Sequence, residues 1–276
     1  MLNQNINDAP LSDEAVTRRD ALSLFGSMGA KLAMAAAPLA VGLTARAVAA
    51  QTAPTLVQIL NFALTLEELE AEFYVKGLAA ANLIPAADRA IFENIRDHEL
   101  SHVRFLRTAL GASAIAKPTF DFTGGKGSNA GPFPAFTNYD VFKVLAQGFE
   151  DLGVRAYKGQ APNLLALNQR GVLLQALRIH SVEARHASEV RRLRGNFSET
   201  APNKGWITGV AVDAPANAIA GIYAAGAAGF PAEDNTTHAT LNVTTVTTVS
   251  ATAVQEAWDE PLDMARVVTL ASMFIV

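Results

Sequence analysis

The chain of 276 residues contains no cysteine. Disulfide bonds, iron–sulfur clusters and thiolate zinc sites are therefore excluded, and any metal ion must be held by oxygen and nitrogen atoms. Basic charge is also scarce, because 22 lysines and arginines stand against 26 aspartates and glutamates, for a formal net charge of -4. A chain of this composition is not expected to bind nucleic acid or an anionic membrane surface.

An uninterrupted hydrophobic run of membrane-spanning length is missing as well. The apolar N-terminal stretch, about residues 21–45, is interrupted by Lys31 and Pro38, which argues against a permanent membrane anchor. Arg18 and Arg19 precede this stretch, and a run of small residues, 47–50, follows it. The pattern resembles a twin-arginine export signal and predicts a periplasmic protein with a signal peptide over residues 1–50. The alternative is a tail followed by an alanine-rich helix.

Four long helical segments are predicted after the signal, at about residues 54–80, 86–110, 138–158 and 168–194. The first two are joined by a tight connection, and so are the last two, so each pair should be antiparallel. The connection at 111–136 is rich in glycine, proline and phenylalanine, and it is long enough to run the length of the bundle. These features predict an all-α four-helix bundle over residues 51–196, with a long crossover between the second and third helices and a C-terminal extension over 197–276.

A repeated pattern of ionisable residues lies within these helices. A glutamate stands seven residues before a tyrosine, and about 32 residues further on a glutamate stands three residues before a histidine. The first copy is Glu67, Tyr74, Glu99 and His102, and the second is Glu150, Tyr157, Glu183 and His186. Residues seven and three apart share one face of a helix, so each copy aims its side chains at a common point. Four carboxylates and two imidazoles are a ligand set for two hard or borderline metal ions.

Charge balance supports a metal site of this kind. Four ionised carboxylates buried together without compensation would cost several kcal/mol each. Two dications would cancel four negative charges and leave both histidines neutral. Fe(II) or Mn(II) suits such donors, and open coordination positions could admit dioxygen, peroxide or water.

The two Glu-x-x-His motifs ELSH and EARH, the Glu-x6-Tyr spacing and the pair Leu60-Asn61 ahead of Glu67 together resemble the ferritin-like superfamily of carboxylate-bridged dimetal proteins. The segments ILNFALTLEELEAEFY, HELSHVRFL, GWITG and AWDEPL are similar to exported ferritin-like proteins related to desiccation-associated proteins. The resemblance implies terminal carboxylates at Glu67 and Glu150, bridging carboxylates at Glu99 and Glu183, and one imidazole for each metal ion at His102 and His186. It implies either an oxidoreductase acting on dioxygen, peroxide or Fe(II), or a non-catalytic stress-related protein that is structural or sequesters metal.

Neighbouring residues leave alternatives open. Glu70 lies one turn from Glu67 and could replace or supplement it. We expect the tyrosines to bond to ligand carboxylates, Glu68 and Glu72 to face solvent, and Arg185 to be a surface residue or to support a ligand. His180 could also support a ligand, although a hydrogen-bonded structural role is favoured for both His98 and His180.

The C-terminal extension is predicted in less detail. Residues 214–229 could form a short helix or a loop, and residues 236–250 could include extended pieces. Ser250 precedes a helical stretch that runs to Trp258, and Pro261 is placed to open a final helix that includes Phe274. That apolar helix should pack on the bundle or on another subunit of a homo-oligomer.

Overall fold

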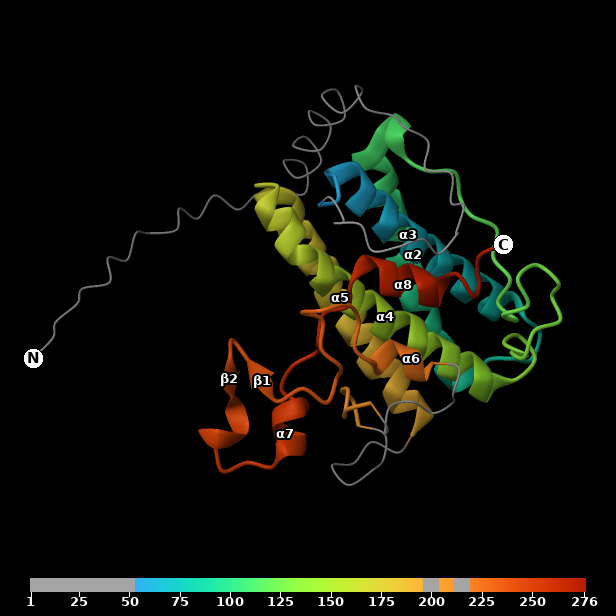
Figure 1. Ribbon diagram of the computed structural model, residues 1–276. Helices are drawn as coiled ribbons and strands as arrows, with labels where there is room; N and C mark the ends of the chain where they lie inside the picture. Colours follow the sequence, from blue (N-terminus) through green and yellow to red (C-terminus); the bar gives the residue numbers. More distant parts are fainter. Residues whose placement is uncertain (1–52, 196–203, 211–218) are drawn as a thin grey trace, which may run out of the picture.

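A computed structural model describes residues 53–195, 204–210 and 219–276. Its main feature is a bundle of four long helices (Figure 1). They are α2 (Leu56–Ala79), α3 (Ala86–Leu110), α4 (Tyr139–Ala166) and α5 (Arg170–Arg194). The helices α2 and α3 pack as one hairpin, α4 and α5 as a second, and α2 contacts α4 between the hairpins. The predicted all-α bundle with a long crossover is confirmed. The predicted export signal, residues 1–50, lies outside the described residues.

Local sequence signals explain where these helices begin and end. Thr55 and Gln58 form a capping box at the start of α2, and the Asn138 side chain accepts from two backbone N–H groups at the start of α4. The helix α4 runs beyond the predicted end at residue 158 and carries Pro162 inside it. Burial of Leu164, which is 1% exposed, explains why the helix continues past a residue that removes a backbone donor.

Two apolar clusters fill the bundle, one toward each end. One contains a group of packed aromatic rings in which Phe73 and Phe142 stack with centroids 4.7 Å apart. The other lies around Leu64, Leu110 and Leu164. The predicted metal ligands occupy helix positions between these two clusters, so the polar layer is enclosed by apolar side chains on both sides.

The crossover between α3 and α4 begins with a short 3-10 helix, η1 (Gly111–Ser113), and runs back along α2. Asn61 on α2 donates to the Ser113 carbonyl at 2.9 Å and accepts from the Ile115 N–H at 2.9 Å. Lys117 pairs with Glu72 at 2.8 Å. The crossover therefore covers a polar stripe of α2 and satisfies its hydrogen bonds.

The prediction that Glu68 faces solvent is wrong, because Glu68 is only 4% exposed. Glu72 is also partly covered, with a side chain 18% exposed. Glu68 accepts from Arg107 Nε at 2.6 Å. The helical periodicity could not reveal this burial, because the covering residues come from the crossover and from α3.

The C-terminal extension consists of short elements. They are α6 (Ala220–Tyr223), β1 (Thr237–His238), β2 (Leu241–Asn242), η2 (Val243–Thr245), α7 (Ala251–Gln255) and α8 (Met264–Ala271). The two strands pair antiparallel and confirm extended pieces in this region. The helix α7 is capped by Ser250 but ends before Trp258. The helix α8 is capped by Asp263, so Pro261 does not open it as predicted. The Pro261 carbonyl instead accepts from Arg155 Nη2 at 3.3 Å.

The extension packs on the bundle through α4, which is one of the two placements expected for the final helix (Figure 1). Val267 and Ala271 on α8 are 0% and 2% exposed, inside the same core cluster as Phe73. Arg155 on α4 is fully buried and pairs with Glu233 Oε1 at 2.8 Å. A Cβ at Gly159 would lie 2.0 Å from the Leu262 carbonyl oxygen, so only glycine allows this close approach.

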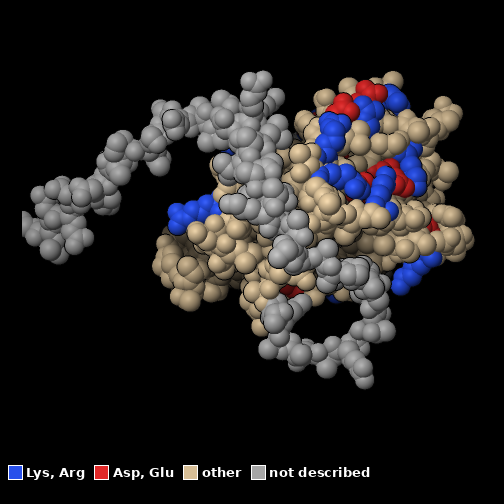
Figure 2. Space-filling model, turned by 90° about the horizontal axis from the view of Figure 1, so that it is seen from above, with Lys and Arg blue, Asp and Glu red and all other residues tan. Residues whose placement is uncertain are grey.

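Surface charges of the two signs are mixed on the face seen in Figure 2. Lysine and arginine side chains there lie next to aspartate and glutamate, and most of the described surface is neither. Within the described residues, no helix is both long enough and apolar enough to cross a membrane.

Candidate metal centre

Each of the four long helices brings ionisable side chains to the middle of the bundle. Glu67 comes from α2, Glu99 and His102 from α3, Glu150 from α4, and Glu183 and His186 from α5. The four carboxylate residues are each 0% exposed. The six predicted ligands therefore converge inside the bundle, at positions that the motif spacing had indicated.

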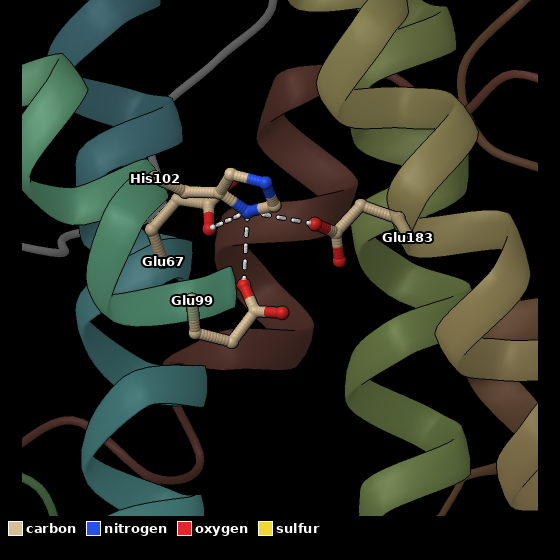
Figure 3. Close-up of side chains that lie close together, drawn as sticks. All are labelled: Glu67, Glu99, His102 and Glu183. Atoms are coloured by element: carbon tan, nitrogen blue, oxygen red, sulfur yellow. Dashed lines mark hydrogen bonds and ion pairs between the residues drawn. The ribbon is translucent and has the colours of Figure 1, made fainter. Parts of the chain in front are cut away.

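The first half of the site is a group of Glu67, Glu99, His102 and Glu183, shown in Figure 3. Their potential ligand atoms all lie within 4.8 Å of one another. His102 Nδ1 is 3.1 Å from Glu67 Oε2, 3.2 Å from Glu99 Oε2 and 3.2 Å from Glu183 Oε1. One imidazole nitrogen thus faces three carboxylates.

The second half is a group of Glu99, Glu150, Glu183 and His186, and its ligand atoms also lie within 4.8 Å of one another. His186 Nδ1 is 2.8 Å from Glu99 Oε1 and 3.2 Å from Glu150 Oε2. Glu99 and Glu183 belong to both halves. This is the placement that bridging carboxylates require, because each has two oxygens and can contact two cations.

The two tyrosines bond crosswise between the helix pairs. The Tyr74 hydroxyl on α2 donates to Glu150 Oε1 on α4 at 2.5 Å, and the Tyr157 hydroxyl on α4 donates to Glu67 Oε1 on α2 at 2.5 Å. Burial and the adjacent carboxylates raise the pKa of both phenols well above the usual value. Both tyrosines therefore remain neutral donors and orient the two carboxylates predicted to be terminal.

Glu70 lies beside the cluster but belongs to neither group of four. It is 3% exposed, and burial together with Glu183 and Glu150 raises its pKa well above the usual value. A Cβ at Gly153 on α4 would lie 3.2 Å from both Glu70 Oε1 and Glu183 Oε2. Gly153 therefore leaves room for these two carboxyl groups, and sequence reasoning did not identify it because a glycine carries no ligand atom.

Protons balance much of the negative charge that the carboxylates bring to the cluster. Burial favours a neutral imidazole, but Glu150 and its neighbours outweigh burial and raise the pKa of His186 to about 11. The pKa of His102 is raised further for the same reason, chiefly by Glu67. Burial raises the pKa of Glu99 to about 7, and it raises that of Glu183 well above the usual value. The cluster thus holds several protons at neutral pH.

The six side chains offer oxygen and nitrogen donors of the kinds that dications bind. Some of their buried oxygens also lack well-placed hydrogen-bond donors, which a cation could replace. The buried oxygens Glu99 Oε1, Glu183 Oε1 and Glu183 Oε2 accept no hydrogen bond of good geometry, although His186 Nδ1 lies 2.8 Å from the first and His102 Nδ1 lies 3.2 Å from the second. Buried carboxylate oxygens without well-aligned donors are costly, and a cation is the partner that would satisfy several at once. All three of these oxygens belong to the two carboxylates shared by both halves.

The other histidines near the motifs have different partners. His98 Nδ1 lies 2.9 Å from His186 Nε2, so this exposed residue touches one of the predicted ligands from outside. His180 Nδ1 donates to the Val154 carbonyl at 3.0 Å. Within the described residues, no hydrogen bond or ion pair joins His180 to the six predicted ligands. His180 thus has the hydrogen-bonded structural role that the sequence analysis favoured over support of a ligand. Arg185 is exposed.

Comparison with protein families matches residues 55–196 to the ferritin-like domain. No curated protein and no solved structure matched the chain. The matched residues span all four long helices and the six converging side chains. By this match, which covers half of the sequence, the chain belongs to the ferritin-like domain family.

Proposed function

We propose that this protein binds two iron or manganese ions inside the bundle and uses them in redox chemistry on dioxygen, peroxide or Fe(II). The observation that carries the proposal is the membership of Glu99 and Glu183 in both groups of four. Two ions held by shared carboxylates would be neighbours and could act on one small molecule together.

The donor atoms narrow the choice of metal. Four glutamates and two histidines offer oxygen and nitrogen, which suit Fe(II) and Mn(II), whereas zinc would bind without redox chemistry. Bound iron or manganese would supply the change of oxidation state that these side chains do not provide. Tyr74 and Tyr157 would keep a proton beside each terminal carboxylate and hold its orientation, and the apolar clusters would exclude water.

Binding should be coupled to proton release. His102 and His186 can offer Nδ1 to a cation only after losing the proton that the carboxylates stabilise. The two ions would then replace these protons as the counter-charge of the carboxylates. Metal affinity should accordingly increase with pH across the neutral range.

Metal titration tests the proposal directly. Metal-free protein is titrated anaerobically with Fe(II) and separately with Mn(II), and elemental analysis should find about two ions per chain. The loaded protein is then assayed for peroxide consumption and for dioxygen-dependent oxidation of added Fe(II). Glu68→Gln is the matched control. Glu68 is a buried glutamate that neighbours Glu67 on α2 but belongs to neither group of four candidate ligands.

Each result has a clear reading. Protein that takes up neither metal would refute the metal centre. Protein that binds two ions but is inert in both assays would favour the alternative, a stress- or desiccation-related protein that sequesters metal. Activity lost with the ligands but kept in Glu68→Gln would support the oxidoreductase.

Export to the periplasm through the twin-arginine pathway is the accompanying proposal. Its support is the pair Arg18 and Arg19 ahead of an apolar stretch, and export of a folded chain would suit a protein that loads metal first. Replacing both arginines with lysine should retain the precursor in the cytoplasm, measured by fractionation and N-terminal sequencing. Arg46→Lys, outside the pair, should leave export unchanged. A mature periplasmic protein that still begins at Met1 would refute a cleaved signal.

A further inference from the structure

The outer edges of the two site histidines have different surroundings. His186 Nε2 lies 2.9 Å from His98 Nδ1, and the two rings stack with centroids 5.2 Å apart. Within the described residues, His102 Nε2 has no hydrogen-bond partner. Its Nδ1 faces the carboxylates, and its other ring nitrogen points away from them (Figure 3).

A single position in the repeat accounts for this difference. His98 stands four residues before His102 and reaches across to His186 on the other helix. The residue four positions before His186 is Val182, whose side chain cannot form a hydrogen bond. Beside His102 there is instead an open cleft of about 140 Å³ between α3 and α5, lined by His102, Phe105, Gln175, Arg178, Ile179 and Val182.

The cleft carries one positive charge. Arg178 is exposed, and its Nη1 donates to Gln175 Oε1 at 3.4 Å. No carboxylate of the described residues forms an ion pair with Arg178. On the His186 side, the position corresponding to Arg178 is Asn94, and the position corresponding to Phe105 is Glu189. The arginine that lines the His102 cleft therefore has no counterpart at the equivalent position of the repeat on the His186 side.

We propose that this cleft binds a small oxyanion, such as a short carboxylate or inorganic phosphate, between the Arg178 guanidinium and the Nε2–H of His102. The proposal rests on the proposed metal centre, because Nε2 carries the proton when Nδ1 faces a metal ion. Metal-ligating histidines almost always donate their other N–H to an acceptor. His98 Nδ1 is that acceptor for His186, and the oxyanion is the acceptor for His102.

The size of the cleft suits a small ligand. Its volume of about 140 Å³ has room for a molecule of a few non-hydrogen atoms, and its mouth is open to solvent. The guanidinium presents several N–H groups in a plane and matches the two oxygens of a carboxylate. Bound there, the anion would strengthen His102 as a ligand and adjust one metal ion without touching the other.

The test is a titration with sodium formate of zinc-loaded protein, at ionic strength held constant with sodium chloride. Zinc is diamagnetic, and the chain has five histidines, so ring signals can be followed by NMR of histidine-labelled protein. We expect a saturable shift of the His102 ring signals, and sodium phosphate should compete with formate. Arg178→Gln should weaken binding about tenfold, as loss of a charged hydrogen bond predicts.

Two further variants make the test specific. Val182→His restores the residue type that covers the other half, and it should abolish the formate response while shifting the His102 signals to a new position. Arg185→Gln removes an exposed arginine of the same helix outside the cleft, and binding should be unchanged. An unsaturable response, or one equal in Arg178→Gln and wild type, would overturn the proposal.

Zinc content is measured on the same samples. Protein that takes up neither zinc nor Fe(II) nor Mn(II) would refute the metal centre, and the formate titration of the metal-free protein would then decide the cleft by itself. Zinc-loaded protein without a His102 response would refute the oxyanion site while leaving the metal centre intact.

Discussion

The two halves of the carboxylate cluster have the same inner residues and different outer surroundings. Each half offers a terminal glutamate, two shared glutamates and one histidine. Outside, His98 covers His186, whereas His102 borders an open cleft that contains Arg178. The repeat therefore preserves what faces the bundle axis, and the two halves differ where they meet solvent. The two proposed ion positions therefore have the same candidate ligands and different surroundings.

The strongest test of this comparison removes a residue that both halves share. Glu99→Ala or Glu183→Ala should abolish binding of both metal ions, because each carboxylate belongs to both groups. Elemental analysis after Fe(II) or Mn(II) loading measures the loss, and Glu68→Gln again serves as the control. Two ions still bound in either alanine variant would mean that the shared carboxylates are not bridges.

Removing one histidine should separate the halves. His102→Ala should weaken mainly the ion on the cleft side, and His186→Ala mainly the other, so each variant should keep about one ion per chain. Isothermal titration with Mn(II) resolves the two binding steps. If both variants lose both ions, the two halves act as one unit and the comparison fails.

The response to pH should be shared by both halves. Glu99 has a pKa raised from 4.5 to about 7, so its contribution to stability is complete below 4.5 and is lost as pH rises through about 7. The raised pKa of His186 has the same sign, with its contribution lost as pH rises from 6.5 through about 11. Metal-free protein should thus unfold more easily at alkaline pH than at neutral pH.

The dependence of stability on pH is measured by thermal unfolding, monitored by circular dichroism at a series of pH values. Metal ions should remove most of it, because they replace the protons as the counter-charge. The lowered pKa of Glu67, which burial opposes and His102 produces, acts in the other direction and appears only in acid. Metal-free protein that gains stability between about pH 5 and about pH 9 would contradict the assignment of these protons.

The smallest expected effect comes from replacing His98, which contacts the outer nitrogen of His186. His98→Leu removes the hydrogen bond to His186 Nε2. It should lower the affinity for the ion beside His186 about tenfold or somewhat more, as is usual when a ligating histidine loses its hydrogen-bond partner. The ion beside His102 should bind as before. Leu100→Ala on the same helix is a control that alters no polar contact. A loss of affinity divided equally between the two ions would remove the distinction between the halves.

Much of the bundle could be predicted because its signals are local. Helical periodicity located the four helices, and the repeated Glu-x6-Tyr and Glu-x-x-His spacings indicated which side chains would converge. The prediction failed for Glu68, which was assigned to solvent by its helix face. It was also incomplete for α4, which continues through Pro162 because Leu164 is buried. Both differences depend on packing partners that lie far away in the chain, which periodicity does not register.

The sequence by itself determined the ligand types, their spacing and the absence of any thiolate, because these follow from residue identity and helix geometry. Only the tertiary structure decided that the tyrosines bond crosswise, that Glu70 stays outside both groups of four, and that His98 covers one histidine while a cleft remains beside the other. These features arise where different helices meet. Contacts of that kind depend on the rotation and separation of packed helices, which no local pattern specifies.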